Sequence, residues 1–302
     1  MEFALATSPN NTPRTRVGCV RYLNTYPLIE GLQRVRGFEL DAAVPSRLID
    51  MLTGPESSDG LLGPRVDIAL VSIIDAAASD VPLCLVPSGM IGCDGQTLTV
   101  RLFSRVPFES VTRLHADTDS HTSVALARVI LAQRFGVRPT TVAFDARERV
   151  PVSDVHDSDG WPETLLLIGD KVVTDSPPAI RYPYQLDLGE AWKDWTGLPF
   201  AYAVWACRDA DRADPRIAAA ATVLDRQRRR NAARLDWIVA RRASELRWPD
   251  DLARAYFGEC LRFEVTPSVR TAAQRFIDEA AGEGIVPPTR LGWLDAPEGA
   301  GG

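Results

Sequence analysis

Long apolar runs, an excess of basic residues and an export signal are all missing from this 302-residue sequence. No stretch approaches the roughly 18 consecutive apolar residues that a transmembrane helix needs. The net charge is −6, which argues against a general nucleic-acid binder because phosphate contact needs a basic surface. Residues 1–16 are polar and lack the basic and apolar regions of a signal peptide. We therefore expect a loose leader over 1–16 and a cytoplasmic protein.

Metal-ligand spacings and nucleotide-binding loops are missing as well. The five cysteines form no C-x-x-C pair and the three histidines show no H-E-x-x-H spacing, so a zinc site is not expected. The cysteines should be reduced and should mostly pack as small apolar side chains. The signatures G-x-x-x-x-G-K-[ST], G-x-G-x-x-G and G-x-S-x-G do not occur. We expect neither a metal nor a cofactor.

What the sequence does contain is a regular alternation of strand-like and helix-like segments. Strands are expected over residues 17–20, 38–44, 67–72, 98–104, 111–116, 140–144, 164–170 and 200–206. Helices are expected over residues 28–35, 45–52, 120–135, 215–246 and 268–281. The Gly/Pro/Ser-rich stretch 53–66 is interpreted as a surface loop. The alternation is typical of parallel α/β sheets.

The length suits two α/β lobes of about 100 residues each. We assign residues 1–100 to the first part of lobe I and 101–200 to lobe II. Residues 201–302 would return to lobe I and supply the C-terminal helices. Ligands of such proteins bind in the crevice beside the carboxyl ends of the strands, which indicates where a functional site should lie.

Polar side chains follow the predicted strands and should face this crevice together. They are Asn24, Ser72, Thr97, Thr99, Ser120, Thr122, Ser123 and Asp170. Each one alone suits a helix cap or a turn. As a set they favour a ligand site, because hydroxyls and free N–H groups at the start of the helix 120–135 would attract an anion. A carboxylate or phosphate is the expected ligand.

Two further features are given structural interpretations. The Arg-rich segment 226–230 is interpreted as the solvated face of a helix, because its apolar neighbours have helical spacing and the chain as a whole is acidic. The Trp and Tyr residues of 182–205 are interpreted as core or hinge packing.

Several motifs occur together and in order: VGCVRYLNTYPL at 17–28, VPS at 44–46, DIALVS at 67–72, TDSHTSVAL at 118–126, LIGD at 167–170, DLGEAW at 187–192, TGLPF at 196–200 and AVW at 203–205. With this set the chain resembles the chorismate dehydratase family of the futalosine route to menaquinone, over about residues 16–285. The resemblance implies a two-lobed α/β fold of the type II periplasmic-binding-protein class, with a ligand cleft between the lobes.

The resemblance also implies a reaction, the loss of water from chorismate to give 3-[(1-carboxyvinyl)oxy]benzoate without a cofactor. No His or Glu stands at a motif position as a dedicated base, so the hypothesis is that the substrate's enolpyruvyl carboxylate takes the ring proton. Asn24 and Thr99 would orient the ring and assist departure of the hydroxyl, and Asp170 is a rival acid or base. Ser72, Thr97, Ser120, Thr122 and Ser123 would bind the dicarboxylate substrate.

The sequence departs from the family pattern at two of these places. His121 stands where the family has arginine, in S-H-T-S, and Thr99 stands where the family has serine. Alternative functions are the sister 1,4-dihydroxy-6-naphthoate synthase and a cytoplasmic carboxylate-binding protein or sensor. The DLGEAW and TGLPF elements favour the dehydratase over the synthase, and turnover of chorismate would separate the enzymes from a pure binder. The sequence leaves the oligomeric state open.

Overall fold

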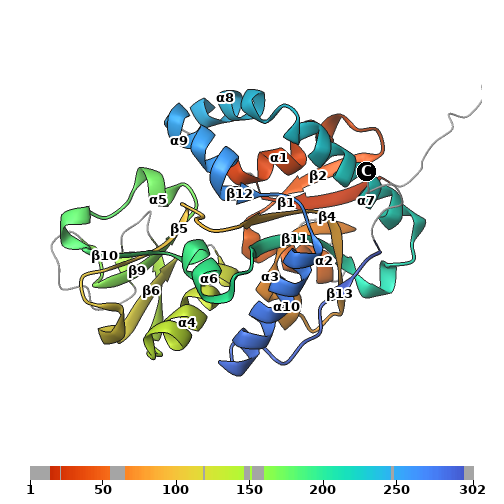
Figure 1. Ribbon diagram of the computed structural model, residues 1–302. Helices are drawn as coiled ribbons and strands as arrows, with labels where there is room; N and C mark the ends of the chain where they lie inside the picture. Colours follow the sequence, from red (N-terminus) through yellow and green to blue (C-terminus); the bar gives the residue numbers. More distant parts are fainter. Residues whose placement is uncertain are drawn as a thin grey trace, which may run out of the picture.

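Two mixed β-sheets, each flanked by helices, form the body of the protein (Figure 1). The computed structural model describes residues 14–20, 22–54, 65–117, 120–145, 150–151, 160–245 and 248–295. The chain passes from the larger sheet to the smaller one through residues 94–99 and returns through 197–199. Within the described residues, no helix is both long and apolar enough to cross a membrane. Most of the predicted leader (1–13) and most of the predicted loop (55–64) lie outside the described residues.

The larger sheet has the strand order β12-β4-β11-β3-β1-β2, with β13 beside β4. These strands are β1 (Thr15–Cys19), β2 (Phe38–Ala42), β3 (Ile68–Ser72), β4 (Leu83–Cys93), β11 (Phe200–Arg208), β12 (Leu261–Arg262) and β13 (Gly292–Trp293). β1 pairs in parallel with β2 and β3, whereas β11 runs antiparallel to β3 and β4. Every residue of β3 is buried, as expected for a central strand covered on both faces.

The smaller sheet has the strand order β10-β5-β9-β6-β7-β8. Its strands are β5 (Val100–Ser104), β6 (Arg113–Asp117), β7 (Thr140–Asp145), β8 (Val150–Pro151), β9 (Thr164–Ile168) and β10 (Tyr184–Asp187). β6 is parallel to β7 and β9, and β5 is antiparallel to β9 and β10. The expected parallel pairing therefore holds for only part of each sheet, because the strands that enter and leave each lobe run antiparallel to their neighbours.

Helices cover both faces of the larger sheet and one end of the smaller one. In Figure 1, α1, α7, α8 and α9 lie above the larger sheet, α2, α3 and α10 below it, and α4, α5 and α6 beside the smaller sheet. Their bounds are α1 (Tyr26–Ile29), α2 (Pro45–Thr53), α3 (Ile73–Ala78), α4 (His121–Phe135), α5 (Lys171–Thr174), α6 (Leu188–Thr196), α7 (Pro215–Ala232), α8 (Leu235–Glu245), α9 (Asp250–Ala255) and α10 (Pro267–Gly282). Short 3-10 turns are η1 (Leu23–Thr25), η2 (Leu32–Arg34), η3 (Phe108–Ser110), η4 (Ala179–Arg181) and η5 (Asp209–Asp211), and η6 (Tyr256–Cys260) is a π-helical turn.

Two expected helices are interrupted. The helix expected over 28–35 ends at Ile29 and resumes as a 3-10 turn at Leu32, because Gly31 adopts a left-handed conformation with φ 87°. The helix expected over 215–246 divides into α7 and α8, with the break at residues 233–234. Both breaks lie on the same side of the larger sheet, where α1 packs against α7 and α8.

The apolar core continues from one lobe into the other. One cluster joins α3 and α10 of the larger sheet to α4 and the inner strands of the smaller sheet. α4 buries nine of its fifteen residues because it packs on the smaller sheet and also contacts α3 and α10. A second cluster fills the opposite face of the larger sheet, under α1 and α7. Shared packing through α4 holds the two lobes in one arrangement.

Candidate active site

A cavity of about 140 Å³ lies between the two sheets, and we call it the inter-sheet cavity. Seven of the eight site residues predicted from the sequence line it: Asn24, Ser72, Thr97, Thr99, Ser120, Ser123 and Asp170. They come from the ends of β3 and β9, the start of α4, the turn η1 and the connection between β4 and β5. Among the described residues that line the cavity, the charged ones are Asp170 and Lys171, and the other polar groups are hydroxyls and one amide.

Thr122, the eighth predicted residue, is buried but is not part of the cavity lining. Its Oγ1 lies 2.6 Å from Oγ of Ser72 and donates to the carbonyl of Tyr202 at 3.1 Å. Thr122 therefore ties the start of α4, in the smaller lobe, to β3 and β11 of the larger one. Its hydroxyl positions Ser72, which itself faces the cavity and caps α3 by accepting from Asp75 N–H.

The N-terminus of α4 faces the cavity through two hydroxyls. Ser120 is the helix cap, since its Oγ accepts from the Ser123 N–H at 3.2 Å and donates to Ser123 Oγ at 3.0 Å. The positive end of a 15-residue helix and the Ser123 hydroxyl thus adjoin the same space. This geometry suits an anionic group of a ligand. Residues 118–119 of the same motif lie outside the described residues.

Tyr256 is a cavity residue that sequence reasoning missed. Its hydroxyl lies 2.9 Å from Oγ1 of Thr99, and it also hydrogen bonds with Asn24. Burial raises the pKa of Tyr256 above its ordinary value, so the phenol stays protonated and can donate a proton in a hydrogen bond. It lies in the π-helical turn η6, which brings it to Thr99 across 157 residues of sequence. No motif in the sequence signals this contact.

The Asp187 carboxylate fixes the backbone that carries Thr97 and Thr99. It accepts from Thr97 N–H at 2.9 Å and from Leu98 N–H at 2.7 Å, and Leu98 has a positive φ of 63°. The same carboxylate caps α6 through Gly189 N–H at 3.0 Å and Glu190 N–H at 3.1 Å. Burial raises the pKa of Asp187, and the backbone N–H donors act in the opposite direction. A strained residue held between two cavity hydroxyls indicates that their placement is structurally enforced.

Gly189, in the DLGEAW motif, leaves no space for a side chain. A Cβ at this position would lie 2.6 Å from both Cys93 Sγ and Gly95 O. The close approach lets the start of α6 pack on the end of β4, so that Asp187 reaches the connection between the sheets. The motif is therefore explained by its contacts with the connection between the two sheets, residues 94–99, although none of its residues lines the cavity.

Asp170 is held from the opposite lobe. The indole N–H of Trp248 donates to its Oδ1 at 2.9 Å, and Trp248 stacks on Tyr256 with ring centroids 5.0 Å apart. Trp248 and Tyr256 belong to the C-terminal part that packs on the larger sheet, whereas Asp170 follows β9. The carboxylate that sequence reasoning proposed as an acid or base thus contacts both lobes.

Lys171, also missed by sequence reasoning, brings a buried cation to the cavity wall. Its Nζ lies 2.7 Å from Oδ1 and 2.6 Å from Oδ2 of Asp117, whose side chain is 1% exposed. Lys171 directly follows Asp170 in the sequence, so one cation and the carboxylates of Asp117 and Asp170 lie at this corner of the cavity. Among the described residues, no group of three or more His, Cys, Asp or Glu is placed to hold a metal ion.

His121, the departure from the family's arginine, does not line the cavity. Its Nδ1 lies 2.8 Å from Oδ1 of Asp75, and the hydrogen bond to Asp75 raises the pKa of His121 above its ordinary value. This pair joins α4 to α3, and therefore one lobe to the other. His121 therefore contributes to the contact between the two lobes and is not part of the cavity lining.

Comparisons with known proteins show the family of the chain. A family model described as menaquinone biosynthesis matches residues 15–282. A chorismate dehydratase from Thermus thermophilus is 29% identical over 245 residues, which cover 76% of this chain and 82% of that protein.

The fold is shared with solved structures of low sequence identity. A protein from Archaeoglobus fulgidus superimposes with a TM-score of 0.59 at 14% identity, over 92% of this chain and all of that one. The aliphatic sulphonate binding protein of Escherichia coli superimposes with a TM-score of 0.54 at 15% identity, over 93% and 89% of the two chains. A Candida albicans protein with the generic periplasmic binding protein fold gives a TM-score of 0.57 at 14% identity, over 92% of each chain. The predicted two-lobed fold is confirmed.

Proposed function

The chain belongs to the menaquinone biosynthesis family, and we propose that it removes water from chorismate to form 3-[(1-carboxyvinyl)oxy]benzoate. The family resemblance seen in the sequence is confirmed, and with it the prediction of an enzyme, a dehydratase of the lyase class. The substrate, the mechanism and the absence of a cofactor belong to the proposal. The observation that supports it is the meeting of Asn24, Thr99 and Tyr256 in the lining of a cavity that also holds Ser123 and Lys171.

Chorismate carries two carboxylates, and the N-terminus of α4 with the Ser123 hydroxyl suits one of them. Lys171 also lines the cavity, but Asp117 already pairs with its charge. Thr122 is left out of the set of ligand contacts because its hydroxyl is engaged with Ser72 and Tyr202. The wall that carries Asn24, Thr99 and Tyr256 would then face the ring.

The reaction breaks a ring C–H bond and the C–O bond of the neighbouring hydroxyl. The electron pair of the C–H bond forms the new ring double bond, and the hydroxyl leaves with one proton as water, so no oxidant or reductant takes part. The enolpyruvyl carboxylate of the substrate accepts the ring proton, and this proton leaves with the hydroxyl as water. Asn24 and the Thr99–Tyr256 pair orient the ring and donate to the departing hydroxyl, with Asp170 as the alternative proton donor. Because aromatisation drives the reaction, the enzyme mainly positions and polarises its substrate.

The test is incubation of the purified, chelator-treated protein with chorismate, followed by mass spectrometry. A protein-dependent product lighter by one water supports the dehydratase and a metal-independent reaction. Chorismate that binds and stabilises the protein without turnover would instead favour the carboxylate sensor. Chorismate that neither binds nor reacts would contradict the proposal and direct attention to the sister synthase reaction.

A further inference from the structure

A second hollow lies where the turn between α7 and α8 meets the segment after α1. It has a volume of about 220 Å³ and is lined by Glu30, Gly31, Arg34, Val35, Arg230, Arg234, Trp237 and Arg241. We call it the anion hollow. None of these residues lines the inter-sheet cavity. The segment 226–230, interpreted from the sequence as a solvated helical face, supplies one of its arginines.

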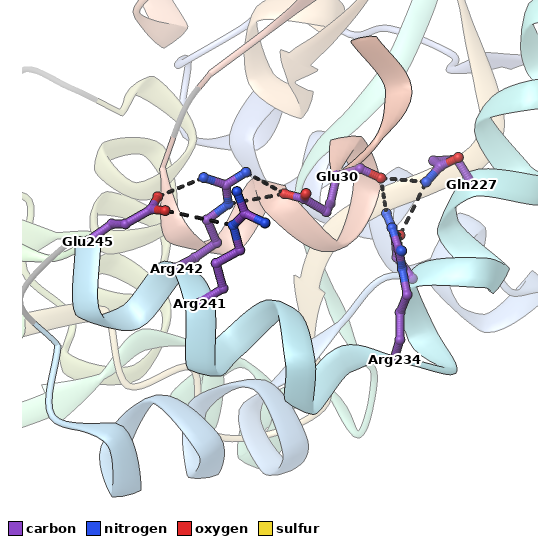
Figure 2. Close-up of polar contacts among 7 residues, drawn as sticks. Glu30, Gln227, Arg234, Arg241, Arg242 and Glu245 are labelled. Atoms are coloured by element: carbon purple, nitrogen blue, oxygen red, sulfur yellow. Dashed lines mark hydrogen bonds and ion pairs between the residues drawn. The ribbon is translucent and has the colours of Figure 1, made fainter. Parts of the chain in front are cut away.

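Four arginines and one glutamate line the anion hollow, in a chain whose net charge is −6. The glutamate is already balanced from outside the lining, because Arg242 donates to Glu30 Oε2 through Nη2 at 2.7 Å and Nε at 3.0 Å (Figure 2). Within the described part of the chain, the guanidinium groups of Arg34 and Arg230 form no hydrogen bond or ion pair. Arg241 has an ion pair with Glu245 at 3.9 Å, a separation at which an exposed pair contributes little. Positive charge is therefore concentrated here without a matching anion.

The guanidinium of Arg234, labelled in Figure 2 near Gln227, is oriented by the neutral amide of Asn231. The Oδ1 of Asn231 accepts from Arg234 Nε at 3.2 Å and from Nη2 at 3.0 Å. Asn231 is fully buried and donates in turn to the Glu30 carbonyl at 3.1 Å, where Gln227 also donates. An amide can hold a guanidinium in one direction without cancelling its charge. Two buried amides one turn apart on α7 thus prepare Arg234 for an anion.

The ring of Trp237 also contacts two of the arginines without cancelling their charge. The guanidinium carbons of Arg234 and Arg241 lie 5.3 Å and 5.5 Å from the centre of its ring. The indole is 48% exposed, which is unusual for so large an apolar side chain. A ring attracts a cation through its π face and leaves the full charge available to a third partner. The exposed tryptophan is explained if it serves to place guanidinium groups.

We propose that the anion hollow binds a diphosphate group. A guanidinium fork matches the oxygens of phosphate in a bidentate manner, and several forks around one space suit an anion that carries several charges close together. A single carboxylate would pair with only one of these guanidinium groups. The shared chemistry is a diphosphate, either free or as part of a nucleotide, and it differs from the dicarboxylate proposed for the inter-sheet cavity.

The test is calorimetric titration of the full chain with inorganic pyrophosphate in low-salt buffer without divalent cations. Arg34→Gln and Arg230→Gln, two exposed surface changes, should each weaken binding at least fivefold, and Arg234→Gln at least tenfold. The matched control is Arg229→Gln, on the same turn of α7 as Arg230, exposed, ion-paired with Asp225 at 2.9 Å and absent from the lining. It should change the affinity less than twofold.

Further titrations decide the class and the location of the ligand. ADP that binds more tightly than pyrophosphate assigns the diphosphate to a nucleotide, and the reverse order assigns it to the free anion. Citrate, which carries a similar charge on carboxylates, should bind at least fivefold more weakly, and equal binding would overturn the diphosphate assignment. Saturating chorismate should leave the pyrophosphate titration unchanged. Three outcomes would overturn the proposal, whatever the outcome for dehydration. They are no binding at millimolar pyrophosphate, competition by chorismate, and an Arg229→Gln variant that weakens binding as much as the variants of the lining arginines.

Discussion

The inter-sheet cavity and the anion hollow hold positive charge in opposite ways. In the cavity, Lys171 lies 2.6 Å from Asp117, so the wall is nearly neutral before any ligand arrives. In the hollow, Arg234 is held by the amide of Asn231 and the ring of Trp237, and its charge is not cancelled. On the two proposals, the cavity would select its ligand through ordered hydroxyls and N–H groups, whereas the hollow would attract its ligand through net charge.

The largest effect separating the two sites should come from Asn24→Ala. Asn24 lines the cavity and bonds with Tyr256, so the change removes an amide from the wall that faces the substrate ring. We expect kcat for chorismate dehydration to fall by about 100-fold, the range associated with loss of a positioned polar group. Near-full turnover would contradict the assignment of Asn24. Pyrophosphate affinity, measured in parallel, should stay within twofold.

Asp187→Asn should disturb the backbone segment that carries the cavity residues Thr97 and Thr99. The Asp187 carboxylate accepts four backbone N–H groups, and an amide has one acceptor oxygen fewer. Leaving buried donors without acceptors should lower the free energy of unfolding by about 2–3 kcal/mol, measured by urea denaturation. Asp194→Asn, an exposed change on the same helix, is the control and should have little effect. Equal stability of the two variants would show that Asp187 does not hold the connection between the sheets.

Thr99→Val and Tyr256→Phe should each lower kcat by about tenfold, because each removes one hydroxyl from a pair 2.9 Å apart. The double variant should be hardly worse than either single one, since the two hydroxyls act together. The measurement is a double-mutant cycle on kcat and KM. Multiplicative losses would mean that the hydroxyls act independently. Tyr184→Phe, at a tyrosine that is 39% exposed, is the control.

Salt should affect the two sites differently. Raising NaCl from about 0.05 to about 0.2 M screens exposed charges, so pyrophosphate affinity should fall roughly fivefold. KM for chorismate should change less than about twofold, because Lys171 and Asp117 are buried. Parallel salt dependence at both sites would remove the distinction between them. Titration calorimetry and steady-state kinetics in matched buffers measure the two responses.

The smallest effect should come from the pair between the lobes, His121 and Asp75. The pKa of His121 is raised above 6.5 by Asp75, so the stabilisation is fully present below about pH 6.5 and is lost as pH rises through the raised pKa. Because the imidazole is half exposed, we expect only about 0.5 kcal/mol. The measurement compares the free energy of unfolding of wild type and His121→Gln at pH 5.5 and 8.5. A difference that grows with pH would contradict the pairing.

Local patterns in the sequence were sufficient for several elements. The residues over β3 and β9 form short runs that are apolar except for one terminal hydroxyl residue, and α4 begins at a serine cap and ends before Gly136 in a left-handed conformation. The longest strand, β4, was missed because Pro87 and Gly89 interrupt its apolar run. That strand is stabilised by its neighbours: it pairs with β11 through a register shift, and a Cβ at Gly92 would lie 2.4 Å from Phe200 O.

The residues of the candidate site likewise divide into those that the sequence could predict and those that it could not. Residues directly after predicted strands, such as Ser72 and Asp170, could be placed from the sequence because the end of a strand is a local feature. Tyr256 could not, because its partner Thr99 is 157 residues away. The roles of Thr122 and Asp187 were also out of reach, since both act by hydrogen bonds to distant parts of the chain.

By itself, the sequence determined the order of most strands and helices, the cap that begins α4, and the family to which the chain belongs, because all three depend on residues that are neighbours in the chain. Only the tertiary structure decided that the sheets are mixed, that Lys171 meets Asp117, and that Arg34 joins Arg230 and Arg234 around one hollow. These contacts depend on how separate elements pack. Packing is a property of the whole fold, because each contact forms only after many others have positioned its two partners.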